Sequence, residues 1–242
     1  MFRMLTGLGF ALLIAANSSA GTISWGPATN TTDLSSISTM GSLVRAFDSG
    51  GLGTTVNGVA FAKAGGVGDD VYAAIGSAIF GGFDGNADLA DLDALLRTAD
   101  YVDPPANTSP TVISLTGLAS GDLYQIQLFF MDQRGSFSSP RCGGCNDRQM
   151  TFTSGPNSVT LDADPENTLA SPFGQYVLGV FTADSSIQAF EVTGVGLLDS
   201  GTPVSLRQVN AWQLRAVPEP SCVLLLGLVV PYVVRQRRNA RA

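Results

Sequence analysis

A series of short strand-like segments occupies the second half of the chain, and it limits the fold more than any other feature of the sequence. The segment Tyr124–Phe130 alternates apolar and polar residues until Phe129, which is typical of a strand with one apolar face. Similar segments recur about every ten residues with turn residues between them, and they are Thr111–Leu115, Leu123–Met131, Gln149–Thr153, Ser158–Leu161, Gln175–Thr182, Ser186–Val192 and Gln208–Leu214. This spacing predicts a mainly β protein, a β-sandwich with jelly-roll-like topology, rather than alternating strands and helices.

The preceding part of the chain carries weaker strand patterns. Thr22–Trp25 and Gly41–Phe47 are short candidates, and Thr54–Phe61 contains an Asn57-Gly58 pair that is typical of a hairpin turn or a bulge. Because glycine is dense from Gly65 to Gly85, we expect no regular structure there.

One short helix is expected in the domain. Leucines recur at helical spacing from Leu89 to Leu96, and acidic residues fall early in the run, where a helix dipole favours them. We therefore predict a helix near Asp88–Thr98. The prolines from Pro104 to Pro110 end it and open a loop.

The N-terminus has the pattern of a secretory signal peptide. Arg3 supplies the positive charge, Leu8–Ala16 forms a short apolar signal helix, and the small residues Ser18 and Ala20 suit cleavage before Gly21. The apolar run is too short to cross a bilayer. Residues 1–20 are therefore predicted to be a signal peptide, which makes residues 21–215 an extracytoplasmic domain.

The C-terminal residues 216–242 have the composition of a membrane segment. Cys222–Val234 is strictly apolar, although it is shorter than the ~20 residues that a spanning helix prefers. Arginines follow it directly, and such a cluster places the C-terminus in the cytoplasm. We predict a C-terminal transmembrane helix that spans only marginally.

This tail resembles the PEP-CTERM sorting signal, which combines a Val-Pro-Glu-Pro motif, an apolar helix and terminal arginines. The match lies at Val217, Pro218, Glu219, Pro220, Arg235, Arg237 and Arg238. The resemblance implies processing by an exosortase-like enzyme and a link to exopolysaccharide or biofilm matrix. It also implies an exported chain that is transiently anchored in the membrane and then reaches the cell surface or the exterior.

The domain is similar to the malectin-like and galactose-binding-like sandwiches that often precede such a tail. The similarity is carried by residues 55–61, 115–128, 146–148 and 174–183. It implies a carbohydrate-binding type of fold, and it brings no ligand residues that can be placed in this chain.

Charge and residue types exclude several functions. Five of the 13 basic residues and one of the 20 acidic residues lie in the two terminal segments, so the domain keeps eight basic and nineteen acidic residues, a net charge of −11. Such acidity argues against nucleic acid as a partner. The chain has no histidine, which removes Ser-His and Cys-His nucleophiles and the common zinc sites.

Two cysteines lie in the domain, three positions apart. Because the compartment is oxidising, we predict a disulfide between Cys142 and Cys145. A redox or metal role would need a helix start beside a strand, or a second ligand pair, and the local pattern has neither.

One acidic run begins like a calcium loop. Asp84, Asn86 and Asp88 place oxygen ligands at alternate positions, but Leu89 and Leu95 stand where an EF-hand loop has its glycine and its last carboxylate. The alternative is a solvated acidic helix start.

Charged and amide residues gather around the loop that follows the strongest strand. They are Asp132, Arg134, Asn146, Asp147 and Arg148. Such side chains on a loop held by a sheet could bind sugar hydroxyls, or they could form ion pairs that order the loop. No carboxylate pair stands out for catalysis, and Glu191 in a strand is weak support for an enzyme.

The sequence therefore favours a non-enzymatic binding or structural module without a cofactor, calcium aside, with extracellular polysaccharide as a candidate partner. The alternative is a secreted glycoside-type hydrolase that uses paired carboxylates.

Overall fold

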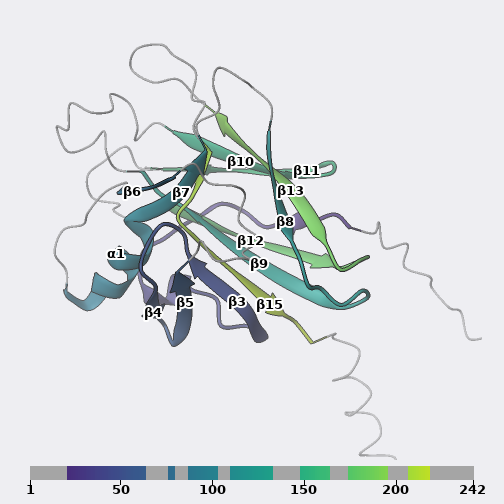
Figure 1. Ribbon diagram of the computed structural model, residues 1–242, viewed down its shortest axis with the longest axis horizontal. Helices are drawn as coiled ribbons and strands as arrows, with labels where there is room; N and C mark the ends of the chain where they lie inside the picture. Colours follow the sequence, from purple (N-terminus) through teal and green to yellow (C-terminus); the bar gives the residue numbers. More distant parts are fainter. Residues whose placement is uncertain are drawn as a thin grey trace, which may run out of the picture.

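The computed structural model describes residues 21–63, 76–79, 87–102, 110–132, 148–163, 174–195 and 207–218 (Figure 1). The predicted signal peptide, the Cys142–Cys145 disulfide and the tail beyond Pro218 lie outside these residues. In the part described, no helix has the length and apolar character needed to cross a membrane.

The protein is mainly β with one short α-helix, as the sequence predicts. The strands are β1 (Ser24–Trp25), β2 (Thr29–Asn30), β3 (Ser42–Asp48), β4 (Thr54–Val56), β5 (Val59–Lys63), β6 (Gly76–Ile79), β7 (Thr98–Val102), β8 (Thr111–Leu115), β9 (Leu123–Phe130), β10 (Gln149–Ser154), β11 (Asn157–Asp162), β12 (Gln175–Thr182), β13 (Gln188–Val195), β14 (Arg207–Val209) and β15 (Ala211–Ala216). The helices are the 3₁₀ turns η1 (Leu34–Ser36) and η2 (Ala87–Leu89) and the α-helix α1 (Ala90–Leu96).

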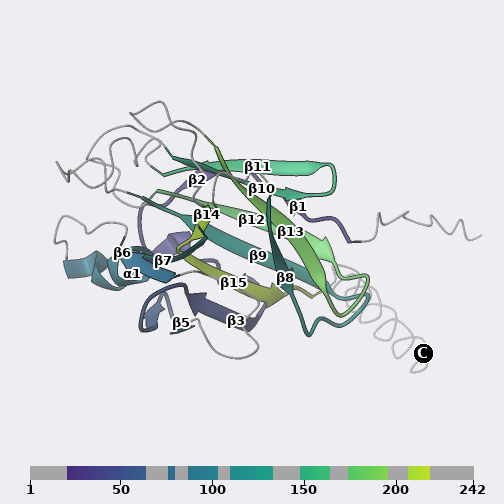
Figure 2. The ribbon, with the colours of Figure 1, turned by 45° about the horizontal axis from the view of Figure 1, so that its top comes forward.

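Two sheets form a sandwich-like pair of layers (Figure 2). The larger sheet has the order β1-β12-β9-β15-β3-β5-β4, with β2 also paired to β12, and the smaller has the order β11-β10-β13-β8. A third sheet, β14-β7-β6, lies at one end. All pairs are antiparallel except β3 with β5.

The main core lies between the two layers. Ile126, Leu128 and Phe130 are alternate residues of β9, and all three are buried in this core. Phe152 of β10 and Phe190 of β13 face them from the smaller sheet. Alternate residues of a strand point to the same face, so the pattern seen in Tyr124–Phe130 places this side of β9 in the core.

The opposite face of the larger sheet is covered as well. Phe129 and Met131 pack in a second apolar cluster with Leu92, Leu95 and Leu96 of α1, and the β4–β5 hairpin adds to it (Figure 1). The apolar alternation in β9 breaks at Phe129 because the side chain of this residue packs in the second cluster.

A layer of buried polar side chains completes this second face. Gln125 and Gln127 of β9 are 2% and 1% exposed. Ser38 donates its backbone N–H to Oε1 of Gln127 at 3.0 Å and its hydroxyl to Oε1 of Gln125 at 2.7 Å. In turn, Nε2 of Gln127 donates to the carbonyl oxygen of Ser36 at 2.6 Å. The Ser- and Thr-rich segment before β3 therefore packs on the sheet through its own backbone.

The Asn57-Gly58 pair forms the turn of the β4–β5 hairpin. Both residues have positive φ, 49° and 73°, as a two-residue hairpin turn of type I′ requires. The register Val56↔Val59 confirms the hairpin and rules out the bulge.

Gly58→Ala is expected to lower the free energy of unfolding by about 1 kcal/mol, because a side chain at positive φ meets its own backbone. No atom lies within 4 Å of a Cβ built there, so the cost is conformational alone. Chemical denaturation measures it. Gly58→Asn is the matched control, since asparagine tolerates this conformation, and an equal loss in both variants would contradict the explanation.

Three expectations about individual segments were wrong. β6 lies within the glycine-rich stretch that we expected to lack regular structure, and it pairs with β7 from Gly76↔Tyr101 to Ile79↔Thr98. The predicted strand Gln208–Leu214 is divided at Asn210 into β14 and β15, which belong to different sheets. The prolines do not end the helix, since α1 ends at Leu96 and β7 begins at Thr98. In all three cases pairing with other strands decides the structure rather than local pattern.

The strand directions give the sandwich two different ends. At the end we call the tail end, β9 starts at Leu123, opposite Thr182 where β12 finishes, and β15 finishes at Ala216. At the opposite end, which we call the loop end, β7, β9, β11 and β13 finish. The chain segments that follow these four strands are 103–109, 133–147, 164–173 and 196–206.

Candidate functional site

Two of the five predicted ligand-contact residues are described, and they bind each other. Nη1 of Arg148 lies 2.8 Å from Oδ2 of Asp132, and the two side chains are 9% and 0% exposed. Arg148 also accepts a hydrogen bond from the backbone N–H of Ala163 at its carbonyl oxygen. Asp132 lies two residues after the end of β9 and Arg148 directly precedes β10, so the pair joins the two sheets at the loop end.

Arg134, Asn146 and Asp147 lie outside the described residues, within the segment that connects the two partners. In the described pair, each charge is neutralised by the other and removed from solvent. This arrangement fixes both ends of the connecting segment. Sugar contact by the remaining three residues stays a prediction.

Asn210 is the centre of a second buried polar group at the same end. Its Oδ1 accepts the backbone N–H of Met131 at 2.9 Å, and its Nδ2 donates to the carbonyl oxygen of Leu96 at 2.7 Å. Nε2 of Gln208 donates to the carbonyl oxygen of Met131 at 2.7 Å. Asn210 thereby links the end of α1 to the end of β9, and it does so from the point where β14 passes into β15.

Asp48 is a third polar group of the loop end, and it closes the loop after β3. Its Oδ2 accepts the backbone N–H of Gly53 at 2.9 Å, and its Oδ1 accepts the hydroxyl of Thr98 at 3.4 Å. The side chain is almost fully buried, and this burial raises the pKa of Asp48 despite the hydrogen bonds that lower it. A Cβ on Gly51 would lie within 2.0 Å of the carboxylate, which explains the glycine there.

The raised pKa gives Asp48 a defined effect on stability. The neutral carboxyl is favoured in the folded state, so its contribution is complete below the ordinary pKa of 3.8 and is lost as pH rises through the raised folded pKa. Asp48→Asn should remove this loss. We therefore expect the free energy of unfolding of the variant, relative to that of the parent, to rise as pH increases from the ordinary pKa of the carboxyl through the raised folded pKa. Chemical denaturation over this pH range measures it.

Asp33 provides a control of opposite sign. Hydrogen bonds from the side chain and the backbone N–H of Ser35 lower the pKa of this exposed carboxyl. Its contribution is therefore present above the ordinary pKa and is lost as pH falls through the lowered value. Asp33→Asn should change the pH profile in the opposite direction to Asp48→Asn. Parallel profiles would contradict the assignment to Asp48.

The candidate calcium ligands are only partly visible. Asp88 lies in η2, ahead of α1, and Asp84 and Asn86 lie outside the described residues. Among the described residues, no three acidic or cysteine side chains come together in a way that could hold a metal ion.

A hollow of about 260 Å³ lies over the smaller sheet, where β10 separates from β13. Thr153, Glu191 and Val112 are partners across β10, β13 and β8, and all three line it. Glu191 is the one carboxylate among the lining residues that the structure describes. The hydroxyl of Thr153 and the carboxylate of Glu191 on an open sheet surface suit hydrogen bonding to a polar ligand. The sequence analysis missed this surface, because the register that aligns the three residues is not readable from any one strand.

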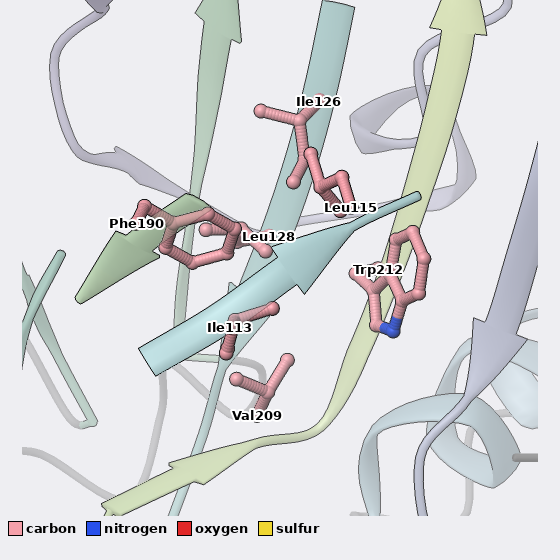
Figure 3. Close-up of a pocket in the computed structure, with 7 residues that line it drawn as sticks. All are labelled: Ile113, Leu115, Ile126, Leu128, Phe190, Val209 and Trp212. Carbon is pink, nitrogen blue, oxygen red and sulfur yellow. The ribbon is translucent and has the colours of Figure 1, made fainter. Parts of the chain in front are cut away.

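The second cavity is a packing void of about 10 Å³ between the sheets. Figure 3 shows the seven apolar side chains that line it, which are Ile113, Leu115, Ile126, Leu128, Phe190, Val209 and Trp212. This volume is near the minimum for one water molecule, and an apolar lining does not retain water. We assign no ligand to it.

Comparisons with known proteins give neither a family nor a curated relative, since no family model and no curated protein matches the chain. A calcium-binding mutant of Bacteroides uniformis beta-glucuronidase 2 is a structural neighbour with 12% identity and a TM-score of 0.46, over 72% of this chain and 18% of that one. The plant receptor-like kinase FER matches with 14% identity and a TM-score of 0.44, over 79% of this chain and 54% of that one.

Proposed function

We propose that this chain is an exported, surface-directed module of the PEP-CTERM type, with a non-enzymatic binding or structural role. The observation that carries the proposal is the position of the two domain ends. Gly21, where signal cleavage is expected, and Pro218, in the sorting motif, both leave the sandwich at the tail end. A domain held there by its membrane segment presents its loop end to the exterior.

The hydrogen bonds at the tail end support this placement. The carbonyl oxygen of Gly21 accepts Nε2 of Gln188 at 2.5 Å, and the backbone N–H of Val217 donates to the carbonyl oxygen of Leu123 at 2.8 Å. The strands β1 and β15 are separated by β12 and β9, so the two exits are about 14 Å apart. Both predicted processing sites would therefore be reached at the same membrane-facing side.

The strand order supports a jelly-roll-like topology for the module. β12-β9-β15-β3 in one layer faces β11-β10-β13-β8 in the other, and the chain passes between layers from β8 to β9, from β9 to β10, from β11 to β12 and from β12 to β13. Such folds bind ligands with the loops at one end of the sandwich or with the outer sheet surface. The loop end and the hollow at Glu191 are the two candidate surfaces here.

The chemistry of these surfaces favours binding over hydrolysis. A glycoside hydrolase of the usual kind needs two carboxyl groups on opposite sides of the scissile bond. In the described residues, the hollow offers Glu191 alone, and Asp132 is occupied by Arg148. A hydrolase remains the alternative function.

Mass spectrometry of the chain from cells that carry an exosortase tests the sorting proposal. We expect an N-terminus at Gly21 and a C-terminus near Pro220. A mature chain that still ends at Ala242 would reduce the tail to an ordinary membrane anchor.

A glycan-array screen of the exported chain, followed by incubation with the bound glycans, tests the molecular role. We expect binding with no release of shorter sugars. Released sugars would establish the hydrolase instead. If the chain binds no glycan, the carbohydrate-binding role is contradicted and the structural role is favoured.

A further inference from the structure

Three large apolar side chains are exposed together at the tail end. Met40, Leu43 and Val44 are 55%, 40% and 43% exposed. We call them the apolar edge. They lie at and just before the start of β3, where the strand extends past both cores, and this is why neither face covers them. An exposed group of this kind marks a contact surface.

The apolar edge is rigidly built. Arg215 of β15 is 7% exposed and holds the turn before β3, donating from Nε to the carbonyl oxygen of Met40 at 2.9 Å and from Nη2 to that of Gly41 at 2.9 Å. On its other side, β3 meets β5 only from Phe47 onward. Within the described part of the chain, the first residues of β3 therefore form an open sheet border.

The same edge lies against the start of the tail. Ser42 pairs with Ala216, and a Cβ built on Gly41 would be 3.3 Å from the Cα of Val217. Three residues separate Pro218 from Cys222, where the apolar segment begins. Even a fully extended chain places these two residues at most about 14 Å apart.

We propose that the apolar edge rests in the interfacial layer of the lipid bilayer while the tail holds the chain. This inference rests on the membrane topology given under the proposed function. If Cys222–Val234 is helical, it measures about 20 Å against a hydrocarbon core of about 30 Å. A segment that is too short draws its flanking residues toward the membrane, and the flanking structure here is the apolar edge.

The surrounding charges define the kind of lipid surface. Asp122 and Asp184 are exposed on turns of the same end, and Ile187, 52% exposed, adds a further apolar side chain. Acidic side chains disfavour anionic headgroups. The edge therefore suits a zwitterionic surface, which aliphatic side chains enter without charge attraction.

A matched pair of tryptophan variants tests the contact. Leu43→Trp places a reporter in the apolar edge, and Leu52→Trp places the same reporter at the loop end, where Leu52 is 88% exposed beyond β3. The exported chain, purified from cells without exosortase, is reconstituted into zwitterionic vesicles with and without brominated acyl chains. The natural Trp25 and Trp212 give a background that the parent chain measures.

We expect Leu43→Trp to lose emission on brominated lipid several times more than Leu52→Trp. Val44→Trp repeats the test if the first variant fails to fold. Vesicle flotation distinguishes the membrane anchor from the apolar-edge contact. A chain that does not float with the vesicles refutes the membrane anchor itself. A floating chain with equal quenching at both positions overturns the apolar-edge contact alone. If the reporter of the Leu43→Trp variant becomes protected from solvent as protein density grows, without quenching, the edge belongs to a contact with a second copy of the chain, and the proposal is again overturned.

Discussion

Arg148→Met should lower the free energy of unfolding by about 3–5 kcal/mol, because it removes the positive charge of Arg148 from beside the buried carboxylate of Asp132. Asp132 is fully buried and its Oδ2 is 2.8 Å from Arg148. Methionine keeps much of the side-chain volume, so the effect reports the charge rather than a cavity. Chemical denaturation of parent and variant measures it.

The exposed ion pair of the same chain is the matched control. Arg97 pairs with Asp93 one helical turn earlier, and the arginine side chain is 46% exposed. Arg97→Met should change the stability by less than about 1 kcal/mol. The double variant Asp132→Leu with Arg148→Met should recover much of the loss. Equal effects of Arg148→Met and Arg97→Met would show that the loop-end pair is not structurally important.

Asn210→Ala should lower the free energy of unfolding by about 2–5 kcal/mol, since it leaves two buried backbone groups without partners. The groups are the N–H of Met131 and the carbonyl oxygen of Leu96. Asn210 itself is fully buried, so water does not replace the lost hydrogen bonds.

Two variants separate this explanation from a general sensitivity to asparagine replacement. Asn57→Gly removes one hydrogen bond, from Nδ2 to the carbonyl oxygen of Ile37, at an exposed turn where glycine tolerates the positive φ, and it should cost about 1 kcal/mol. Asn210→Asp keeps an acceptor for Met131 but has no donor for Leu96. It should be at least as harmful as alanine, and parent-like stability of this variant would refute the role given to Nδ2.

Strands that have one face in the main core were predictable from the sequence. β8 and β12 have the predicted bounds, Thr111–Leu115 and Gln175–Thr182, and β9 ends one residue before its expected end. Their apolar residues alternate because one side of each strand faces the main core. The leucines of α1 were equally clear for the same reason, since they face the second cluster.

Elements that depend on distant partners were not predictable. β6 and β7 pair with each other and β14 joins them, although none of the three has a marked apolar pattern. The burial of the glutamines of β9 was not predictable, because nothing in the local sequence shows that the backbone near Ser38 covers them. The charged cluster was visible as a group, but its two described members needed the two sheets to bring them 2.8 Å apart.

The position of β15 has a consequence for the export that we propose. Among the described strands β15 is the last along the chain, yet it lies between β9 and β3 in the middle of the larger sheet. Before β15 is added, the strands on either side of it lack their common neighbour, and Trp212 and Leu214 are missing from the core. If the chain is exported as proposed, the domain would therefore complete its fold only after β15 had crossed the membrane. The predicted apolar segment begins at Cys222, a few residues after β15, so in that case the last step of folding would take place next to the predicted anchor.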